Sequence, residues 1–288
     1  MFKPYILDGA MGSELIRRGV VLPKHIWSAF ANINNPNLVY KIHNEYINSG
    51  ANIIIANTFR TTPRSYKKTG INLNNANKLA YQSLNSAIDI ANQAAKNNTK
   101  IFASVAPLED CYKPKLFPGY KIAKKEFQQL ENWLKNTKIN GILLETMNNI
   151  IELKAALTAF QNIQKPVWVS LFLKNSQHIA SGDKIIDIIS IINNFNVDCL
   201  LLNCNSLSLT ERALKILNNN WDGKIGIYPN LGPSPPIPDG NINSICSDKN
   251  YILHLNNLLN YDLYVIGACC GSNPSHTKLL KNFIDNNC

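Results

Sequence analysis

Short apolar runs alternate with longer amphipathic segments along the whole chain. Eight runs have the near-continuous apolar character of parallel strands covered on both faces. They are residues 5–8, 52–58, 101–106, 141–146, 167–173, 197–203, 224–228 and 264–268. Residues 37–48, 75–96 and 208–218 between them have the spacing of helices with one apolar face. A final helix is predicted after Asn273, which can cap it, because Pro274 suits the first helical position.

Eight strands that alternate with helices over 288 residues are typical of a (β/α)8 barrel. A doubly wound open sheet is the alternative, but no Gly-x-Gly-x-x-Gly turn follows any predicted strand. No linker, low-complexity tract or internal repeat divides the chain, so we expect residues 1–288 to form one TIM-barrel domain. The proline-rich segment 229–240 follows the seventh predicted strand, and its prolines favour an extended, stiff path.

Composition and charge narrow the possible functions. The chain is 45% apolar, enough for a sizeable core, but no run approaches the roughly 18 consecutive apolar residues of a membrane span. The net charge is +10, yet the basic residues are scattered as singles and short pairs, so we expect no nucleic-acid partner. The first residues lack an apolar signal region, and seven cysteines that include an adjacent pair argue against a disulfide framework. We therefore expect a cytoplasmic protein without a membrane partner.

Polar side chains and thiols lie at the ends of several predicted strands. In a (β/α)8 barrel the carboxyl ends of all the strands open at one face, where such enzymes form their sites. The residues at these ends are Asp8, Asn57, Thr58, Glu145, Thr146, Asn203, Cys204, Tyr228, Pro229, Asn230, Cys269 and Cys270, and Gly9 lies in the turn after the first strand. Asp8 could instead cap the helix that follows it, and Thr58 could only satisfy loop backbone groups.

The three strand-end cysteines suggest a metal site. Cys204, Cys269 and Cys270 can converge on one zinc ion, which favours soft ligands, and three protein ligands leave one position open. Burial as small apolar residues is the alternative for each of them. Asp8 and Glu145 suit an ammonium group, and the turn at 9–12 offers backbone N–H groups to a carboxylate. A ligand with an amine, a carboxylate and a metal-seeking group is a thiol amino acid.

Five segments, in order along nearly the whole chain, resemble the motifs of the homocysteine S-methyltransferase family. They are Leu-Asp-Gly-Ala-Met-Gly-Ser-Glu-Leu (7–15), Ala-Asn-Thr-Phe (56–59), Leu-Glu-Thr (144–146), Asn-Cys (203–204) and Gly-Ala-Cys-Cys-Gly-Ser-Asn-Pro-Ser-His (267–276). The resemblance implies a (β/α)8 barrel with zinc thiolates at Cys204, Cys269 and Cys270. It also implies that Asp8 and Glu145 hold the homocysteine amino group.

The chain departs from the family pattern at two positions. Leu201 stands where a glycine is usual, and Asn148 stands where a proline is usual. We expect Leu201 to alter local packing, and neither change removes a metal ligand. His276, in the first turn of the last helix, is expected to be exposed rather than to bind a metal.

The expected function is zinc-dependent methyl transfer to the thiolate of homocysteine, which gives methionine. The expected donor is a cationic small molecule, with S-methylmethionine or S-adenosylmethionine favoured over betaine by the resemblance. We expect no catalytic group beyond the zinc-activated substrate thiolate. The expected substrate-binding residues are Asp8, Gly9, Thr58, Glu145 and Asn203. Selenocysteine or another thiol could replace homocysteine, and a non-catalytic zinc- or thiol-binding barrel is the alternative from another class; the sequence indicates no oligomeric state.

Overall fold

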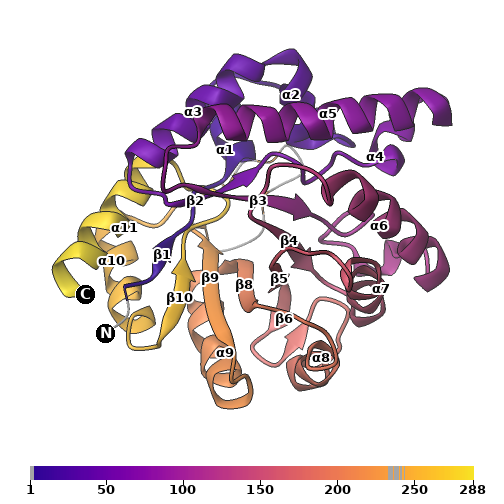
Figure 1. Cartoon of the computed structure of the whole chain (residues 1–288). Helices are drawn as coiled ribbons and strands as arrows, with labels where there is room; N and C mark the ends of the chain where they lie inside the picture. Colours follow the sequence, from indigo (N-terminus) through magenta and orange to yellow (C-terminus); the bar gives the residue numbers. More distant parts are fainter. Residues whose placement is uncertain (1–2, 233–235, 237–239, 241, 243) are drawn as a thin grey trace.

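The computed structural model describes residues 3–232, 236, 240, 242 and 244–288 (Figure 1). Eight parallel strands form one sheet in the order β1-β10-β9-β8-β5-β4-β3-β2. The strands are β1 (Tyr5–Ile6), β2 (Ile53–Ala56), β3 (Lys100–Val105), β4 (Gly141–Met147), β5 (Val167–Leu171), β8 (Cys199–Ser206), β9 (Lys224–Asn230) and β10 (Leu263–Ile266). Each overlaps one predicted strand, so the predicted number and order of strands are confirmed.

The two edges of this sheet meet beside β1. Leu7, directly after β1, forms a parallel bridge with Ile53 of β2. The N–H of Asp8 donates to the carbonyl of Ile53 at 2.9 Å, and the N–H of Asn52 donates to the carbonyl of Ile6 at 2.9 Å. The sheet is therefore closed into a barrel, and the predicted (β/α)8 fold is confirmed.

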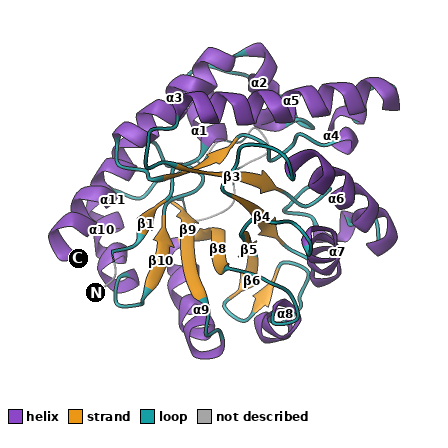
Figure 2. Ribbon diagram, in the orientation of Figure 1, coloured by secondary structure: helices purple, strands orange, loops and turns teal. Residues whose placement is uncertain are grey.

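Helices surround the barrel (Figure 2). Between β1 and β2 lie α1 (Met11–Arg17), the 3-10 turn η1 (Trp27–Phe30), α2 (Ala31–Asn34) and α3 (Pro36–Asn48). The next connections contain α4 (Pro63–Lys67) with α5 (Leu73–Ala94), then η2 (Pro114–Leu116) with α6 (Tyr120–Leu134), and then α7 (Ile150–Phe160). After β5 come the short hairpin β6 (Leu173–Asn175) and β7 (His178–Ile179), followed by α8 (Ile185–Ile192). The last helices are α9 (Leu207–Asn220), α10 (Asp248–Leu258) and α11 (Pro274–Asn287).

Alternate residues of the strands form two apolar layers, as strand geometry requires. The layer between the strands and the helices is the larger one, and includes Ile54, Leu144 and Ile227. The layer inside the barrel receives a residue from every strand or its immediate end: Leu7, Ile53, Phe102, Leu143, Trp168, Cys199, Leu201, Tyr228 and Val265. This inner layer fills the barrel below the carboxyl ends of the strands, so the open end lies on the side of the candidate residues.

Leu201 is accommodated in the inner layer by a glycine on the neighbouring strand. Leu201 of β8 and Gly226 of β9 are register partners. A Cβ atom on Gly226 would lie 2.4 Å from Val265 and 2.9 Å from the side chain of Leu201. The bulky residue at 201 is therefore matched by the missing side chain at 226, and the barrel keeps its closed form.

The last helix begins as the sequence predicts, but its first turn is buried. The Asn273 side chain accepts from the N–H groups of Ser275 and His276, and Pro274 is the first helical residue. The His276 ring accepts from the Asn273 N–H at 3.2 Å, which completes a reciprocal capping box. His276 is buried, so the expectation that it is exposed was wrong: the ring turns back onto the helix start instead of toward solvent.

Two further points concern segments that the sequence singled out. In the part of the chain that the structure describes, no helix has the length and apolar character needed to cross a membrane. The extended path predicted for the proline-rich segment 229–240 cannot be compared with the fold, because residues 233–235 and 237–239 lie outside the described residues.

Candidate metal and substrate site

Three thiols meet at the carboxyl ends of β8 and β10. The Sγ atoms of Cys204, Cys269 and Cys270 lie within 4.8 Å of one another. Cys204 Sγ is 2.8 Å from Cys269 Sγ, and Cys269 Sγ is 3.9 Å from Cys270 Sγ. Sulfur atoms on one tetrahedral zinc, each bonded at about 2.3 Å, are separated by about 3.8 Å. The thiol donor set and the separation within the Cys269–Cys270 pair fit zinc, and the Cys204–Cys269 pair would have to widen by about 1 Å.

A strained backbone and one buried amide fix the positions of Cys204 and Cys270. Cys204 has a left-handed backbone with φ of 55°, which non-glycine residues rarely adopt. Asn230, fully buried at the end of β9, lies between the two cysteine-bearing strands. Its Nδ2 donates to the Cys204 carbonyl at 2.9 Å, and its Oδ1 accepts from the Cys270 N–H at 3.1 Å. A single side-chain amide therefore connects the backbones of two of the three thiol residues.

Electrostatics single out Cys270 as the first thiol of the cluster to ionise. Hydrogen bonds from the thiols of Cys204 and Cys269 hold the pKa of Cys270 well below its usual range. Hydrogen bonds with Cys269 and Cys270, in contrast, raise the pKa of Cys204. The Tyr112 hydroxyl, in the loop after β3, also lies beside Cys270 and lowers its pKa. The cluster thus holds one thiolate readily, and a cation at its centre would favour ionisation of the others.

Two carboxyl groups lie at the ends of β1 and β4. Asp8 is buried, and its Oδ2 accepts from the Ile55 N–H at 3.0 Å. Burial raises the pKa of Asp8 well above its usual value, and the charge of Glu145 raises it further. Glu145 accepts a short hydrogen bond from the Ser104 hydroxyl, and burial raises its pKa to about 7. The described residues provide neither carboxylate with a Lys or Arg partner, which is the environment that a bound ammonium group would complete.

Tyr228 lies close to the same carboxylate. Its hydroxyl is buried and near Glu145 and Ser170, but it makes no well-formed hydrogen bond with a described residue. Burial, and then the charge of Glu145, raise the pKa of Tyr228 well above its usual value. Tyr228 therefore stays protonated and has a donor available at the inner edge of the site.

Asn203 and Thr58 reach the site region, but their side chains are used within the protein. Asn203 Oδ1 accepts from the Thr146 N–H at 3.2 Å and from the Ser170 hydroxyl at 2.6 Å, and its Nδ2 donates to Thr146 Oγ1 at 2.8 Å. The Thr58 hydroxyl donates to the Ser104 carbonyl at 2.8 Å. These contacts connect the ends of β8, β5 and β4 and of β2 and β3, so both residues shape the walls of the site.

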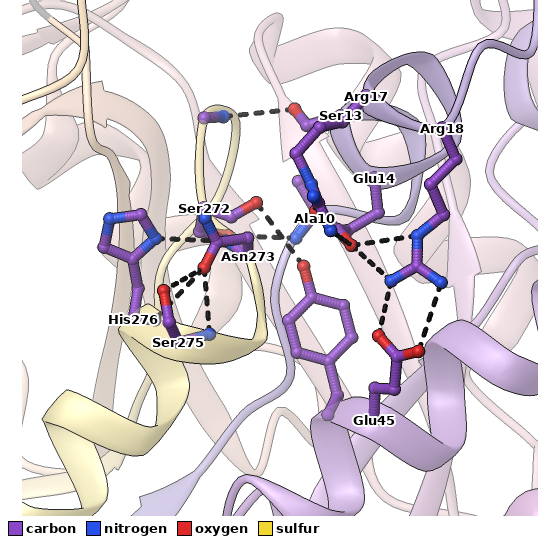
Figure 3. Close-up of polar contacts among 12 residues, drawn as sticks. Ala10, Ser13, Glu14, Arg17, Arg18, Glu45, Ser272, Asn273, Ser275 and His276 are labelled. Atoms are coloured by element: carbon purple, nitrogen blue, oxygen red, sulfur yellow. Dashed lines mark hydrogen bonds and ion pairs between the residues drawn. The ribbon is translucent and has the colours of Figure 1, made fainter.

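The turn after β1 is fastened to the turn that carries the cysteine pair (Figure 3). The Ala10 N–H donates to Ser272 Oγ at 3.1 Å, and the Gly271 N–H donates to Ser13 Oγ at 3.1 Å. A Cβ atom on Gly9 would lie 2.5 Å from Ser272 Oγ and 2.7 Å from the Tyr46 ring. Gly9 is therefore required for close packing, and the turn that carries Asp8 is fixed against the cysteine turn.

Some residues of this site were predicted from the sequence and others were not. The structure brings the three cysteines together and places Asp8 and Glu145 within electrostatic influence of each other. Tyr112, Ser104 and the bridging role of Asn230 were not found from sequence. Asn230 carried a partial signal, since it is a polar residue directly after the seventh predicted strand, whereas Tyr112 lies in a loop without any local pattern.

Comparison with known proteins places this site in a family. A family model described as homocysteine S-methyltransferase matches residues 5–284. Homocysteine S-methyltransferase 3 of Zea mays is 25% identical over 309 residues, covering 98% of this chain and 90% of that protein. Homocysteine S-methyltransferase of Escherichia coli K12 is 27% identical over 246 residues, covering 79% of this chain and 77% of that protein.

A solved structure has the same fold. The crystal structure of the homocysteine methyltransferase MmuM from Escherichia coli, in its metallated form, matches with a TM-score of 0.83. The match has 23% sequence identity and covers 98% of this chain and 96% of that one. The family match spans almost the whole chain, including every strand and the three clustered thiols. The chain belongs to the homocysteine S-methyltransferase family.

Proposed function

We propose that this protein transfers a methyl group from a cationic small-molecule donor to the sulfur of homocysteine, giving methionine, and that it requires zinc. The observation that carries the proposal is the cluster of Cys204, Cys269 and Cys270, together with two carboxyl groups, Asp8 and Glu145, that have no Lys or Arg partner among the described residues. Membership of the family supports the reaction class. The metallated form of the MmuM relative supports a metal at the thiols.

Cys204, Cys269 and Cys270 would hold the zinc. Zinc coordinated by three thiolates keeps a further sulfur ligand deprotonated at neutral pH, which is the chemistry that makes the substrate sulfur nucleophilic. Asn230 keeps the backbones of Cys204 and Cys270 in place while the thiols ionise. In this scheme the chain itself supplies no general base.

Asp8 and Glu145 would bind the substrate ammonium group. Each is favoured as an anion once a positive charge lies beside it, and burial strengthens that attraction. Ser104 orients Glu145 through its hydroxyl. Holding the amino acid at its ammonium end fixes the position of its sulfur, and alignment of the two reactants contributes a large part of the rate.

The negative character of the site favours a cationic donor, because charge is neutralised as the methyl group moves. Tyr112 and Phe172 form an edge-to-face pair with ring centroids 5.1 Å apart, and the Tyr112 hydroxyl lies beside Cys270. Aromatic rings attract sulfonium and ammonium groups. S-methylmethionine and S-adenosylmethionine are the donors we favour, homocysteine is the favoured acceptor, and selenocysteine is the alternative acceptor.

The test is methionine formation from homocysteine with a panel of methyl-labelled donors: S-methylmethionine, S-adenosylmethionine and betaine. The protein is stripped of metal with a chelator and assayed before and after zinc is restored, with labelled methionine measured by mass spectrometry. We expect activity only with zinc and with a sulfonium donor. Full activity after complete metal removal would contradict the zinc requirement. Homocysteine binding without transfer from any donor would favour the non-catalytic barrel.

A further inference from the structure

His43 is a buried polar side chain that the proposed function leaves unused. It lies on α3, on the face that contains Ile42 and Tyr46, and its side chain is fully buried. Neither ring nitrogen has a hydrogen-bond partner among the described residues. Its Nδ1 lies 3.9 Å from Asp8 Oδ2, just beyond hydrogen-bond distance.

An imidazole in this position is costly without a purpose. Buried donors and acceptors in folded proteins are almost always paired, because each unpaired group loses its hydration without compensation. An apolar side chain of similar volume would avoid that loss. Asp8 Oδ2, which lies near Nδ1, already accepts from the Ile55 N–H and can accept a second hydrogen bond.

We propose that His43 is a positioning residue for Asp8: when the substrate ammonium group arrives and Asp8 ionises, the His43 N–H at Nδ1 closes the gap and donates to the carboxylate. This inference rests on the proposed function, in which Asp8 binds that ammonium group. A charged carboxylate is a much stronger acceptor than a neutral carboxyl group, so the contact forms with the ligand. Asp8 is then held by Ile55 on one side and His43 on the other.

The neutral state of the ring is what makes this role useful. Burial lowers the pKa of His43 to about 4, so the ring carries no charge at neutral pH. A lysine or arginine here would neutralise Asp8 and compete with the substrate ammonium group. A neutral N–H orients the carboxylate and leaves its whole charge for the ligand.

A pair of amide substitutions distinguishes the role of Nδ1 from that of Nε2. In His43→Asn the amide nitrogen can take the place of Nδ1, the atom that faces Asp8, whereas in His43→Gln it takes the place of Nε2, which does not. We expect the Asn variant to keep the homocysteine KM within about threefold of the wild type. We expect the Gln variant, and His43→Leu, to raise KM about tenfold with kcat unchanged, since the lost contact acts equally on bound substrate and transition state.

A second background tests whether His43 acts through Asp8. In Asp8→Asn protein, the change His43→Gln is expected to have no further effect on KM. Equal KM values for the Asn and Gln variants, or an undiminished effect of His43→Gln in the Asp8→Asn background, would overturn the inference. Calorimetric titration of each zinc-loaded variant with methionine measures the affinity for an amino acid with the same ammonium group, without turnover. If the wild-type protein binds methionine but forms no methionine from homocysteine, the proposed function alone is overturned. If it binds neither methionine nor homocysteine, the proposed function and this inference are both overturned.

Discussion

Asn203 holds Thr146 at both its backbone and its side chain. Asn203 Oδ1 accepts from the Thr146 N–H, and Asn203 Nδ2 donates to Thr146 Oγ1. Thr146 directly follows Glu145 and has a left-handed backbone with φ of 58°. This strained conformation at the end of β4 is maintained by a side chain from β8, two strands away in the sheet. The position of Glu145 therefore depends on Asn203.

Replacing Asn203 with Ala leaves the Thr146 N–H without its partner and removes the acceptor of the Ser170 hydroxyl. We expect the free energy of unfolding to fall by about 2–3 kcal/mol and the homocysteine KM to rise. Urea unfolding followed by circular dichroism measures the first, and initial-rate kinetics measure the second. A loss of stability with an unaltered KM would mean that Asn203 does not position Glu145.

The metal-ligand assignment is tested by single cysteine substitutions. Cys269→Ala and Cys270→Ala are each expected to lower bound zinc to well below one equivalent and to abolish methionine formation, because two thiolates hold zinc far less tightly than three. Cys199→Ala is the matched control, since Cys199 is a free thiol on the same strand as Cys204 but lies in the inner layer of the barrel. Zinc content is measured by mass spectrometry of the purified protein. A full equivalent of zinc in either ligand variant would show that the ligands are assigned wrongly.

Glu145 is expected to reduce stability at alkaline pH. Its native pKa of about 7 exceeds the ordinary value of 4.5, so the native state holds a proton that the unfolded state has lost between these pH values. The stability that this proton provides is present below pH 4.5 and lost as the pH rises to about 7. Glu145→Gln should therefore raise the free energy of unfolding at pH 8 by up to about 3 kcal/mol, while activity falls.

The same substitution provides its own control at low pH. At pH 4.5 the wild-type side chain is neutral in the native state, so the two proteins should unfold at nearly the same urea concentration. The measurement is a pair of urea titrations of metal-free protein at the two pH values. An equal gain at both would indicate that packing, and not ionisation of Glu145, separates the variants.

Asn230 is expected to control metal affinity. Asn230→Ala leaves the Cys204 carbonyl and the Cys270 N–H without their shared partner, and we expect zinc to bind about 10- to 100-fold more weakly. Asn205→Ala is the control: Asn205 directly follows Cys204, is also buried and makes a similar pair of contacts, but with the backbone of Leu171 and Leu173 and not with that of a cysteine. Competition with a chromogenic chelator measures both affinities. Equal weakening by the two substitutions would indicate a general loss of strand packing.

The strand pattern and the thiol positions were readable from sequence because both are local properties. Buried parallel strands produce apolar runs, and the cysteines lie directly at the ends of those runs. Helix starts were less exact: residues 208–218 were predicted as a helix, whereas α9 begins at Leu207 with Ser206 as its cap. β8 continues past Cys204 to Ser206, so the helix follows the strand without a loop. The extra strand residues follow from pairing with β9, which the sequence of β8 alone does not indicate.

The supporting residues were not predictable in the same way. His43 is one polar position on an amphipathic helix, and its place beside Asp8, 35 positions earlier in the chain, is seen only in the folded structure. Tyr112 lies beside Cys270 although the two are 158 positions apart in the chain. The burial of His276 depends on a capping box whose second hydrogen bond comes from the histidine itself. The roles of His43 and Tyr112 therefore arise from contacts between distant segments, whereas the His276 contact is local but uses a histidine where a capping box usually has Glu or Gln.

The hydrogen bond from Ala10 to Ser272 joins residues 262 positions apart. Cys204 and Cys269 are themselves separated by 65 positions. Contacts of such long range form late in folding, because the loops that they close are costly in entropy. A metal held by these thiols would therefore not nucleate the fold as zinc does in a zinc finger; it would bind after β8 and β10 have come together. In a growing or partly folded chain, Cys204 is apart from the Cys269–Cys270 pair, so the thiols would be most exposed to oxidation before a metal could bind to all three.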